Sequence, residues 1–187
     1  MGVVTGSWCQ VVSAARDGVS SAGVASETMR RDLPAGPVSV DPVADDDADL
    51  ADLLRRTVAE LTRRYPDYHP EPYVGDAEYF VARLDGRPVG CIALVVHDDL
   101  PGVGEVKRLY VDDSARRAGV AQALMSGLEA RARERGLTRI VLETGNRQPE
   151  AVALYGRLGY VVVDPYHPQG WNEVSIFMAR GLAPPEE

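Results

Sequence analysis

Residues 104–125 read Gly-Glu-Val-Lys-Arg-Leu-Tyr-Val-Asp-Asp-Ser-Ala-Arg-Arg-Ala-Gly-Val-Ala-Gln-Ala-Leu-Met. The first part, 104–111, alternates in the manner of a β-strand. The last part begins a helix whose apolar positions fall four residues apart, at Val120, Leu124, Leu128 and Ala132. A short polar segment with two arginines and several small residues joins the two parts. The stretch therefore predicts a strand, an anion-binding loop and a helix in direct succession.

The joining segment has the features of an anion site. Small residues at 118, 119 and 121 let a ligand approach the main chain closely. The first N–H groups of a helix have no partners within the helix. Together with the helix dipole and the guanidinium groups of Arg116 and Arg117, these donors would hold a pyrophosphate. The alternative is that the same residues only begin a solvated helix, because a short glycine-containing motif is weak by itself.

A second stretch supports the interpretation as an anion site. It predicts a short buried strand at 140–143, a helix at 149–158 with proline in its first turn, a stop at Gly159 and a strand at 160–163. The combination of Arg-x-x-Gly-x-Ala at 116–121, Ala-x-x-Leu-Tyr at 151–155 and Gly-Tyr at 159–160 resembles the GNAT superfamily of acetyl-CoA-dependent N-acetyltransferases. The resemblance covers roughly 38–179, and its specific part is confined to 105–160.

The resemblance implies an α/β (α+β) GNAT fold. Such a fold has a central mixed, mostly antiparallel sheet that is splayed at its fourth strand, with helices on both faces. The other elements predicted from the pattern are strands at 38–43, 78–84, 88–97 and 173–178, and a helix from the aspartates at 45–47 to about Tyr65. A hairpin turn is predicted at Asp85-Gly86.

A chain of 187 residues predicts one domain. Residues 1–37 show no sustained period and end in Pro-Ala-Gly-Pro, which predicts a disordered or loosely attached N-terminal extension. The acetyltransferase domain would then span 38–183, followed by a tail at 184–187. The formal net charge of −8 argues against a nucleic-acid partner and mildly favours a cationic or amine substrate.

The remaining composition excludes several other classes of protein. Cys9 and Cys91 are far apart, and the histidines lack partners at ligand spacing, so neither a disulfide framework nor a metal site is predicted. No apolar run is long enough to span a membrane, and the N-terminus lacks the pattern of a signal peptide. We therefore expect a cytoplasmic protein without a membrane partner. The resemblance also implies a homodimer.

The resemblance makes acetyl-CoA the co-substrate and assigns residues to it. The main chain of Leu109, Tyr110 and Val111 would pair with the pantetheine arm on the splayed strand. Ala121 replaces a second glycine of the loop, and Gln148 replaces an asparagine that contacts the pantetheine in many members, so its amide would bind from a different distance. The pyrophosphate would lie against the loop residues Arg116, Arg117, Ala118, Gly119, Val120, Ala121 and Gln122.

The chemistry of amine acetylation requires a base, because the acceptor nitrogen must be unprotonated and a lysine-type amine has a pKa of about 10.4. The resemblance makes Glu105 the first candidate, with burial expected to raise its pKa. Glu143, on the following strand, is the second. Either could instead be a structural carboxylate paired with a cation such as Lys107. Strand alternation would place Glu105 and Lys107 on the same face as Leu109 and Val111.

Tyr155 matches the tyrosine that protonates the departing thiolate in the family, where a phenol can donate a hydrogen bond to the developing charge. The alternative is a core tyrosine on an amphipathic helix. The loops at 66–75 and 164–172 are expected to contact the acceptor, although the first could also be a rigid surface loop. The acceptor contacts expected in these loops are Tyr68, His69, Tyr73 and His167.

These residues predict transfer of an acetyl group from acetyl-CoA to a primary amine by direct attack in a ternary complex. Direct attack is expected because no Ser or Cys is placed as an acyl carrier. The acceptor would be a small molecule, with a protein N-terminus or a lysine as further options. The alternative is a noncatalytic acyl-CoA-binding or sensing module. A nucleotide-binding phosphate loop is disfavoured, because the Gly-Lys-Ser/Thr ending that such loops use is missing.

Overall fold

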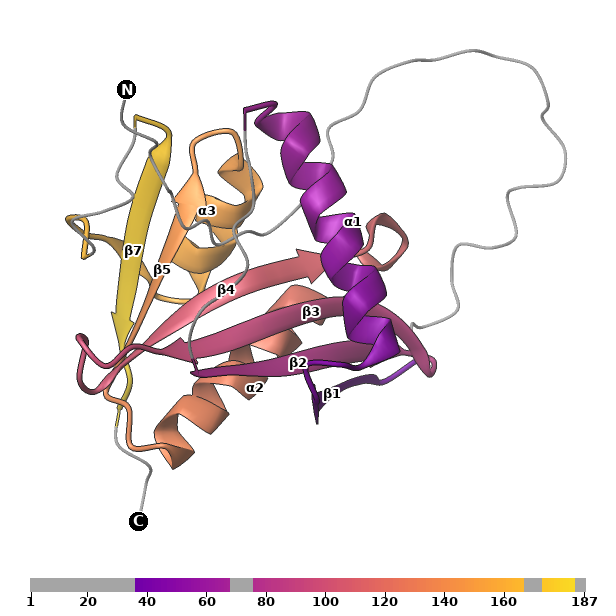
Figure 1. Ribbon diagram of the computed structural model, residues 1–187, viewed down its shortest axis with the longest axis horizontal. Coiled ribbons are helices and arrows are strands. Elements are labelled where there is room, and N and C mark those ends of the chain that lie inside the picture. The colour runs from indigo at the N-terminus through magenta and orange to yellow at the C-terminus, as the bar shows by residue number, and fades with distance from the viewer. Residues whose placement is uncertain (1–35, 68–75, 167–172, 184–187) are drawn as a thin grey trace, which may run out of the picture.

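The computed structural model describes residues 36–67, 76–166 and 173–183. Within these ranges the strands form one seven-stranded sheet with the order β1-β2-β3-β4-β5-β7-β6 (Figure 1). The elements are β1 Val38–Val43, α1 Ala48–Arg64, β2 Asp76–Leu84, β3 Arg87–Val96, β4 Val103–Val111, a 3₁₀ turn Asp113–Ala115, α2 Val120–Glu134, β5 Arg139–Gly145, α3 Pro149–Arg157, β6 Val161–Val162 and β7 Ser175–Gly181.

The sheet is antiparallel throughout except between β4 and β5, which run parallel. The register between β4 and β5 ends at Val106 and Leu142, whereas β4 stays paired with β3 as far as Val111. The two strands therefore diverge over the second half of β4. This is the predicted splay at the fourth strand, and with it the predicted mixed, mostly antiparallel fold is confirmed.

Helices cover both faces of the sheet, α1 on one side and α2 on the other (Figure 1). On the α2 side, the predicted apolar positions of α2 are all buried in the larger core cluster. On the α1 side, Leu50 and Leu53 pack against Val81 and Cys91. The Asp47 carboxylate caps α1 by accepting a hydrogen bond from the Leu50 N–H at 2.9 Å, which is a preferred N-cap arrangement. The apolar period therefore fixed which side of each helix faces the sheet.

A β-bulge in β4 overturns the predicted sharing of faces. Tyr110 lies opposite Cys91 and Lys107 lies opposite Ala93, so β4 uses three steps where β3 uses two. Arg108 takes up the extra residue with a φ of 56°, in the left-handed region.

The bulge reverses the alternation beyond Arg108. Leu109 and Val111 join Val106 in the core on the α2 side, and Tyr110 turns to the α1 side. The prediction that Leu109 and Val111 share a face with Glu105 and Lys107 is wrong for this reason.

Several predicted segments differ from the structure or lie outside its described part. The last strand was expected at 173–178, but β7 is Ser175–Gly181 because its extent is set by pairing with β5, from Gly145 opposite Ser175 to Arg139 opposite Gly181. The acceptor residues Tyr68, His69, Tyr73 and His167 lie outside the described residues, as does 1–35 of the predicted extension. Among the described helices, none has the length and apolar character needed to cross a membrane.

Candidate active site

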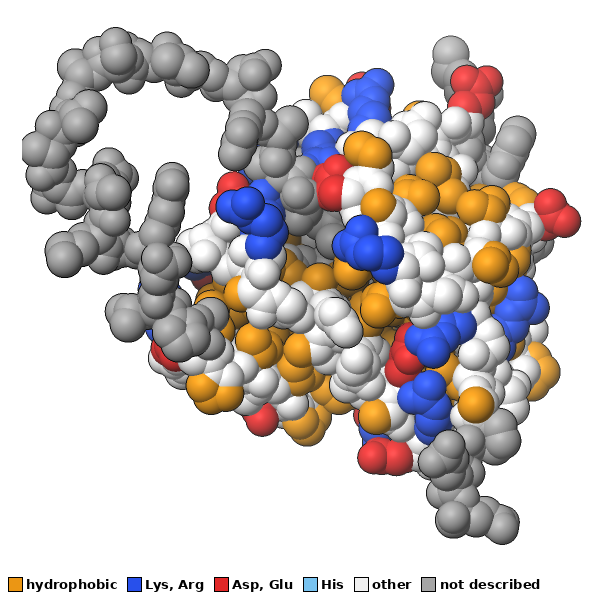
Figure 2. Space-filling view, turned by 180° about the vertical axis from the view of Figure 1, so that it is seen from behind, with side chains coloured by type: hydrophobic (Ala, Val, Ile, Leu, Met, Phe, Trp, Pro, Cys, Tyr) orange, Lys and Arg blue, Asp and Glu red, His pale blue; other side chains and the backbone are white. Residues whose placement is uncertain are grey.

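A cavity of about 400 Å³ lies where the end of β4 meets the start of α2 and one side of α3. Seven of the residues predicted to contact the co-substrate line it, namely Val111, Arg116, Arg117, Gly119, Val120, Ala121 and Gln122. Leu109, Tyr110 and Ala118 were predicted with them but are not among the lining residues. On the face that carries α2, basic side chains are scattered among acidic and apolar ones (Figure 2). Recognition of an anion on this face would therefore depend on the local geometry of the cavity.

The start of α2 is open to a ligand. Gly119 is the N-cap residue, with a φ of 80°, and no side chain of the described residues caps the first turn. A Cβ atom at this position would meet no atom of the described residues within 4 Å, so these residues leave the space beside the helix terminus open. The N–H groups of the first turn and the positive end of the helix dipole point toward such a space. A phosphate group fits this terminus.

Arg116 is the strongest sign that an anion belongs in the cavity. Its side chain is only 16% exposed, and its buried Nε and Nη2 atoms have no hydrogen-bond partner among the described residues. Nη2 lies in ion-pair contact with the Asp113 carboxylate but without hydrogen-bond geometry. Buried guanidinium nitrogens are normally hydrogen-bonded, and a phosphate oxygen is a suitable acceptor for them. The residues present therefore fit a pyrophosphate.

One wall of the cavity comes from α3 and was not predicted. Glu150, Leu154 and Arg157 line it. Their spacing of four and then three residues places them on one face of a helix, so the sequence contained a signal for this wall. Tyr155 is the one residue of α3 that the sequence predicts to belong to the site. The lining residue Ala115 was also missed.

Gln148 and Tyr155 are buried beside the cavity and do not line it. Gln148 is fully buried, and its Oε1 accepts hydrogen bonds from the Thr144 hydroxyl at 3.1 Å and the Gly145 N–H at 3.2 Å. The hydrogen bonds to this amide oxygen thus stabilise the turn between β5 and α3. Tyr155 is fully buried in the core on the α2 side, with its ring centroid 5.8 Å from that of Tyr160.

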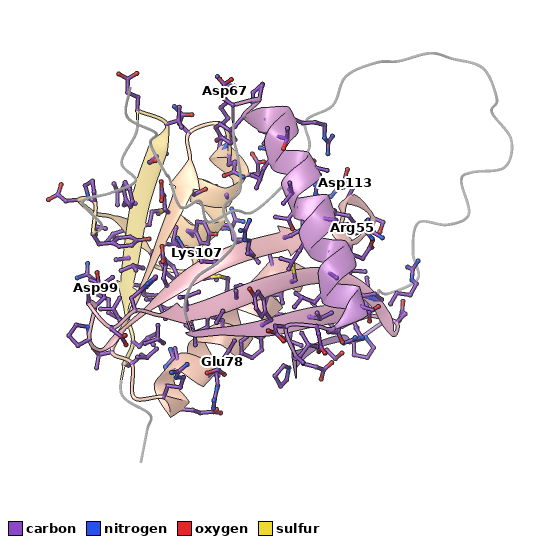
Figure 3. The ribbon with its side chains drawn as sticks, in the orientation of Figure 1. Arg55, Asp67, Glu78, Asp99, Lys107 and Asp113 are labelled. Atoms are coloured by element: carbon purple, nitrogen blue, oxygen red, sulfur yellow. The ribbon has the colours of Figure 1, made fainter. Side chains whose placement is uncertain are left out.

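A buried polar cluster lies on the α1 side of β4 and β5, around the Glu105 carboxylate. Its Oε1 is 2.5 Å from Lys107 Nζ and accepts a hydrogen bond from the Tyr166 hydroxyl at 2.6 Å. Its Oε2 is 2.6 Å from His97 Nε2. Both Glu105 and Lys107 are almost completely buried, and Lys107 lies over the central part of the sheet (Figure 3).

The expected rise in the pKa of Glu105 is wrong. Burial does favour the neutral acid, but the hydrogen bond to His97, the charge and hydrogen bond of Lys107 and the hydrogen bond from Tyr166 outweigh it. Together they lower the pKa of Glu105 to about 2. Glu105 is therefore a carboxylate at neutral pH, and all its partners stabilise that form.

Glu143 has the opposite electrostatic environment. It is 3% exposed, and its Oε1 accepts a hydrogen bond from the Ser175 hydroxyl at 2.6 Å. Burial raises its pKa to about 7, with the charge of Glu105 adding to the rise, while Ser175 and Lys107 oppose it. Two neighbouring buried carboxyl groups thus differ in proton affinity, which is the pattern by which active sites assign acid and base roles.

Comparisons with known proteins agree with this geometry. The model of the Acetyltransferase (GNAT) family matches residues 48–160. The chain is 34% identical over 143 residues to the IAA acetyltransferase of Azospirillum brasilense. This alignment covers 71% of this chain and 93% of that protein. A crystal structure described as an acyl-CoA N-acyltransferase from Klebsiella pneumoniae is 31% identical, with a TM-score of 0.66 over 78% of this chain and 98% of that one.

A GNAT family acetyltransferase from Elizabethkingia anophelis, solved with acetyl-CoA bound, shares the fold at 19% identity, with a TM-score of 0.58 over 78% of this chain and 98% of that one. The family match covers more than half of the chain, in the region that holds both the cavity and the buried carboxyl groups. The chain belongs to the GNAT family of acetyltransferases and is an enzyme that transfers an acyl group from an acyl-CoA to an acceptor.

Proposed function

We propose that the enzyme acetylates a primary amine, using acetyl-CoA bound in the cavity and Glu143 as the proton acceptor. The observation that carries this proposal is the buried Glu143 carboxyl, whose pKa of about 7 lets it accept a proton at physiological pH. In the reaction, the proton leaves the ammonium for Glu143, directly or through water. The free amine then attacks the thioester carbonyl and the C–N bond forms. The C–S bond breaks as the thiolate takes up a proton, and the nitrogen loses its second proton to give the neutral amide, which balances the proton that the thiol gains.

The position of the co-substrate follows from the cavity and the splay. We place the pyrophosphate at Arg116 and the first turn of α2, with Arg117 and Arg157 beside it. The pantetheine arm would run along β4 beyond Val106, where pairing with β5 has ended. The bulge at Arg108 lies in the pairing of β4 with β3. On the side that faces β5 we propose the main chain of Leu109, Tyr110 and Val111 as the partner of the arm.

We propose Glu143 over Glu105 because the two differ in how tightly they hold a carboxylate. Glu105 accepts hydrogen bonds on both oxygens, and its pKa of about 2 makes it a very weak base. Efficient general bases have a pKa near the working pH, as Glu143 does. In this proposal Glu105 neutralises Lys107, whose positive charge would otherwise bind the Glu143 carboxylate more strongly.

The Glu105→Gln variant tests this division of roles through its pH profile. Activity requires Glu143 as a carboxylate, so kcat/KM in the parent should rise with pH through a pKa of about 7. The negative charge of Glu105 raises the pKa of Glu143, and the positive charge of Lys107 lowers it. Removing the Glu105 charge should therefore lower the pKa of Glu143 and move the acid limb to lower pH. Activity lost at every pH in a folded variant would instead make Glu105 the base.

Tyr155 is our proposed donor to the departing thiolate. It follows Leu154, which lines the cavity, and its own side chain is buried in the core beside the cavity. We expect Tyr155→Phe to lower kcat by about 10²- to 10⁴-fold, as for the loss of a general acid, with the KM for acetyl-CoA unchanged. Thiol release followed at saturating co-substrate measures the effect. An unchanged kcat in the folded variant would assign Tyr155 to the core alone.

A screen of primary amines tests the proposed function as a whole. Thiol release from acetyl-CoA would be followed with a polyamine, an aromatic amine, a free peptide N-terminus and a lysine-containing peptide. We propose a small-molecule amine as the acceptor, since the net charge of −8 mildly favours a cationic substrate. Acetyl-CoA binding without turnover on any amine would favour the noncatalytic binding module. A homodimer and a cytoplasmic location remain predictions.

A further inference from the structure

Glu150 is the one carboxylate among the described residues that line the co-substrate cavity. The other charged residues of the lining are Arg116, Arg117 and Arg157. An acidic side chain in a cavity that receives phosphate groups repels the ligand unless its charge is compensated. A cation that pairs with Glu150 from outside the cavity would compensate this charge and leave the arginines of the lining to the ligand.

That cation is Arg64, in the last turn of α1. Its Nη1 lies 2.7 Å from Glu150 Oε1, across the junction between α1 and α3. Both side chains are partly buried, with exposures of 15% for Arg64 and 28% for Glu150, so water screens the pair less than it screens a surface pair. Arg64 is not among the residues lining the cavity. Its contact with the cavity lining therefore runs through Glu150, and its own charge acts on a bound anion only from a greater distance.

The Arg64 side chain is held in place by a network that joins α1 to the turn between β5 and α3. Its Nε donates to Glu60 Oε1 at 3.1 Å, and its Nη1 also donates to the Arg147 carbonyl at 2.8 Å. In return, Arg147 Nη1 donates to the Arg64 carbonyl at 2.8 Å, and the Arg147 N–H donates to the Tyr65 hydroxyl at 3.0 Å. These bonds fix the guanidinium against Glu150 before any ligand arrives.

We propose that Arg64 is a positioning residue for the co-substrate site, which draws the Glu150 carboxylate toward α1 and neutralises it so that the phosphates of an acyl-CoA can bind. The inference rests on the proposed function, because it takes the cavity to be the acyl-CoA site. The competing role is purely structural, with Glu150 stabilising the first turn of α3 and Arg64 joining two helices.

A double-mutant cycle separates these roles. Calorimetric titration with acetyl-CoA would be carried out on the full chain, on Arg64→Met, on Glu150→Gln and on the double variant. We expect Arg64→Met to weaken binding by about five- to tenfold, the size expected of one uncompensated like charge at a partly screened site. Glu150→Gln should bind at least as tightly as the parent. The double variant should bind like Glu150→Gln, because the repelling charge is gone.

Two further measurements complete the test. Arg63→Met is the matched control, since the neighbouring Arg63 is 71% exposed and pairs with Glu60 rather than Glu150. It should leave acetyl-CoA binding unchanged. In turnover, Arg64→Met should raise the KM for acetyl-CoA while kcat stays the same, and melting curves should confirm that each variant is folded.

The outcomes distinguish this inference from the proposed function beneath it. A folded parent that does not bind acetyl-CoA would overturn the proposed function. A parent that binds, together with an Arg64→Met variant that binds equally well, would overturn only the role of Arg64. Weakened binding that Glu150→Gln does not restore would also overturn it, because the effect would then not pass through the Glu150 charge.

Discussion

Glu143→Gln is expected to lower kcat by about 10²- to 10⁴-fold, the usual contribution of a general base. The substitution keeps the shape of the side chain and an oxygen that can accept the hydrogen bond from Ser175, but it removes the group that takes the proton. Because Glu143 does not line the cavity, the KM for acetyl-CoA should stay close to that of the parent. The loss should therefore appear in kcat alone.

The measurement is steady-state thiol release at saturating acetyl-CoA with the best amine from the screen. Glu173→Gln is the control, because Glu173 is an exposed carboxylate just before β7 and should be replaceable without loss. A melting curve shows whether the buried substitution is tolerated. If Glu143→Gln kept most of its kcat while Glu105→Gln lost it, the assignment of the base would pass to Glu105.

Arg116→Glu is expected to weaken acetyl-CoA binding by on the order of 100-fold. The substitution removes a guanidinium whose buried Nε and Nη2 atoms have no hydrogen-bond partner among the described residues, and it puts a repelling charge in its place. The ion pair with Asp113 is also lost, but Asp113 is largely exposed, so its contribution to stability is small. The effect should therefore fall on the co-substrate and leave the fold intact.

Calorimetry or the KM for acetyl-CoA would show the loss. Arg139→Glu makes the same charge change at an exposed position opposite Val103, at the start of β4, whereas the cavity lies at its end. This control should bind like the parent. Equal affinity of Arg116→Glu and Arg139→Glu would place the phosphates somewhere other than the start of α2.

The parts of the fold that could be predicted depend on local patterns. The four-residue spacing from Val120 to Ala132 fixed the buried face of α2, and an aspartate before α1 fixed where that helix begins. The loop at 116–122 could be predicted to line a pocket, as it does, because glycine, small residues and arginines lie within one short segment, and its anion-binding role stays a prediction. The splay of β4 from β5 came only from the family resemblance, since strand pairing is a tertiary property.

The errors arise where distant partners override a local pattern. No residue type near Arg108 announces a bulge, so simple alternation placed Leu109 and Val111 on the wrong face. The predicted shift in the pKa of Glu105 had the wrong direction, because His97 and Tyr166, which lower this pKa, come from other segments of the chain. The ion pair of Arg64 and Glu150 joins residues on different helices, and the sequence of neither helix predicts contact with the other.

The most direct test of the account is to follow backbone amide resonances by NMR while the chain is titrated with acetyl-CoA. We predict that the largest shifts fall on 116–122, at the start of α2, and on 107–111 of β4, where pairing with β5 has ended. Arg116→Glu should abolish these shifts at the same ligand concentration. Shifts confined to other surfaces, or no shifts in a folded protein, would contradict the placement of acyl-CoA in this cavity.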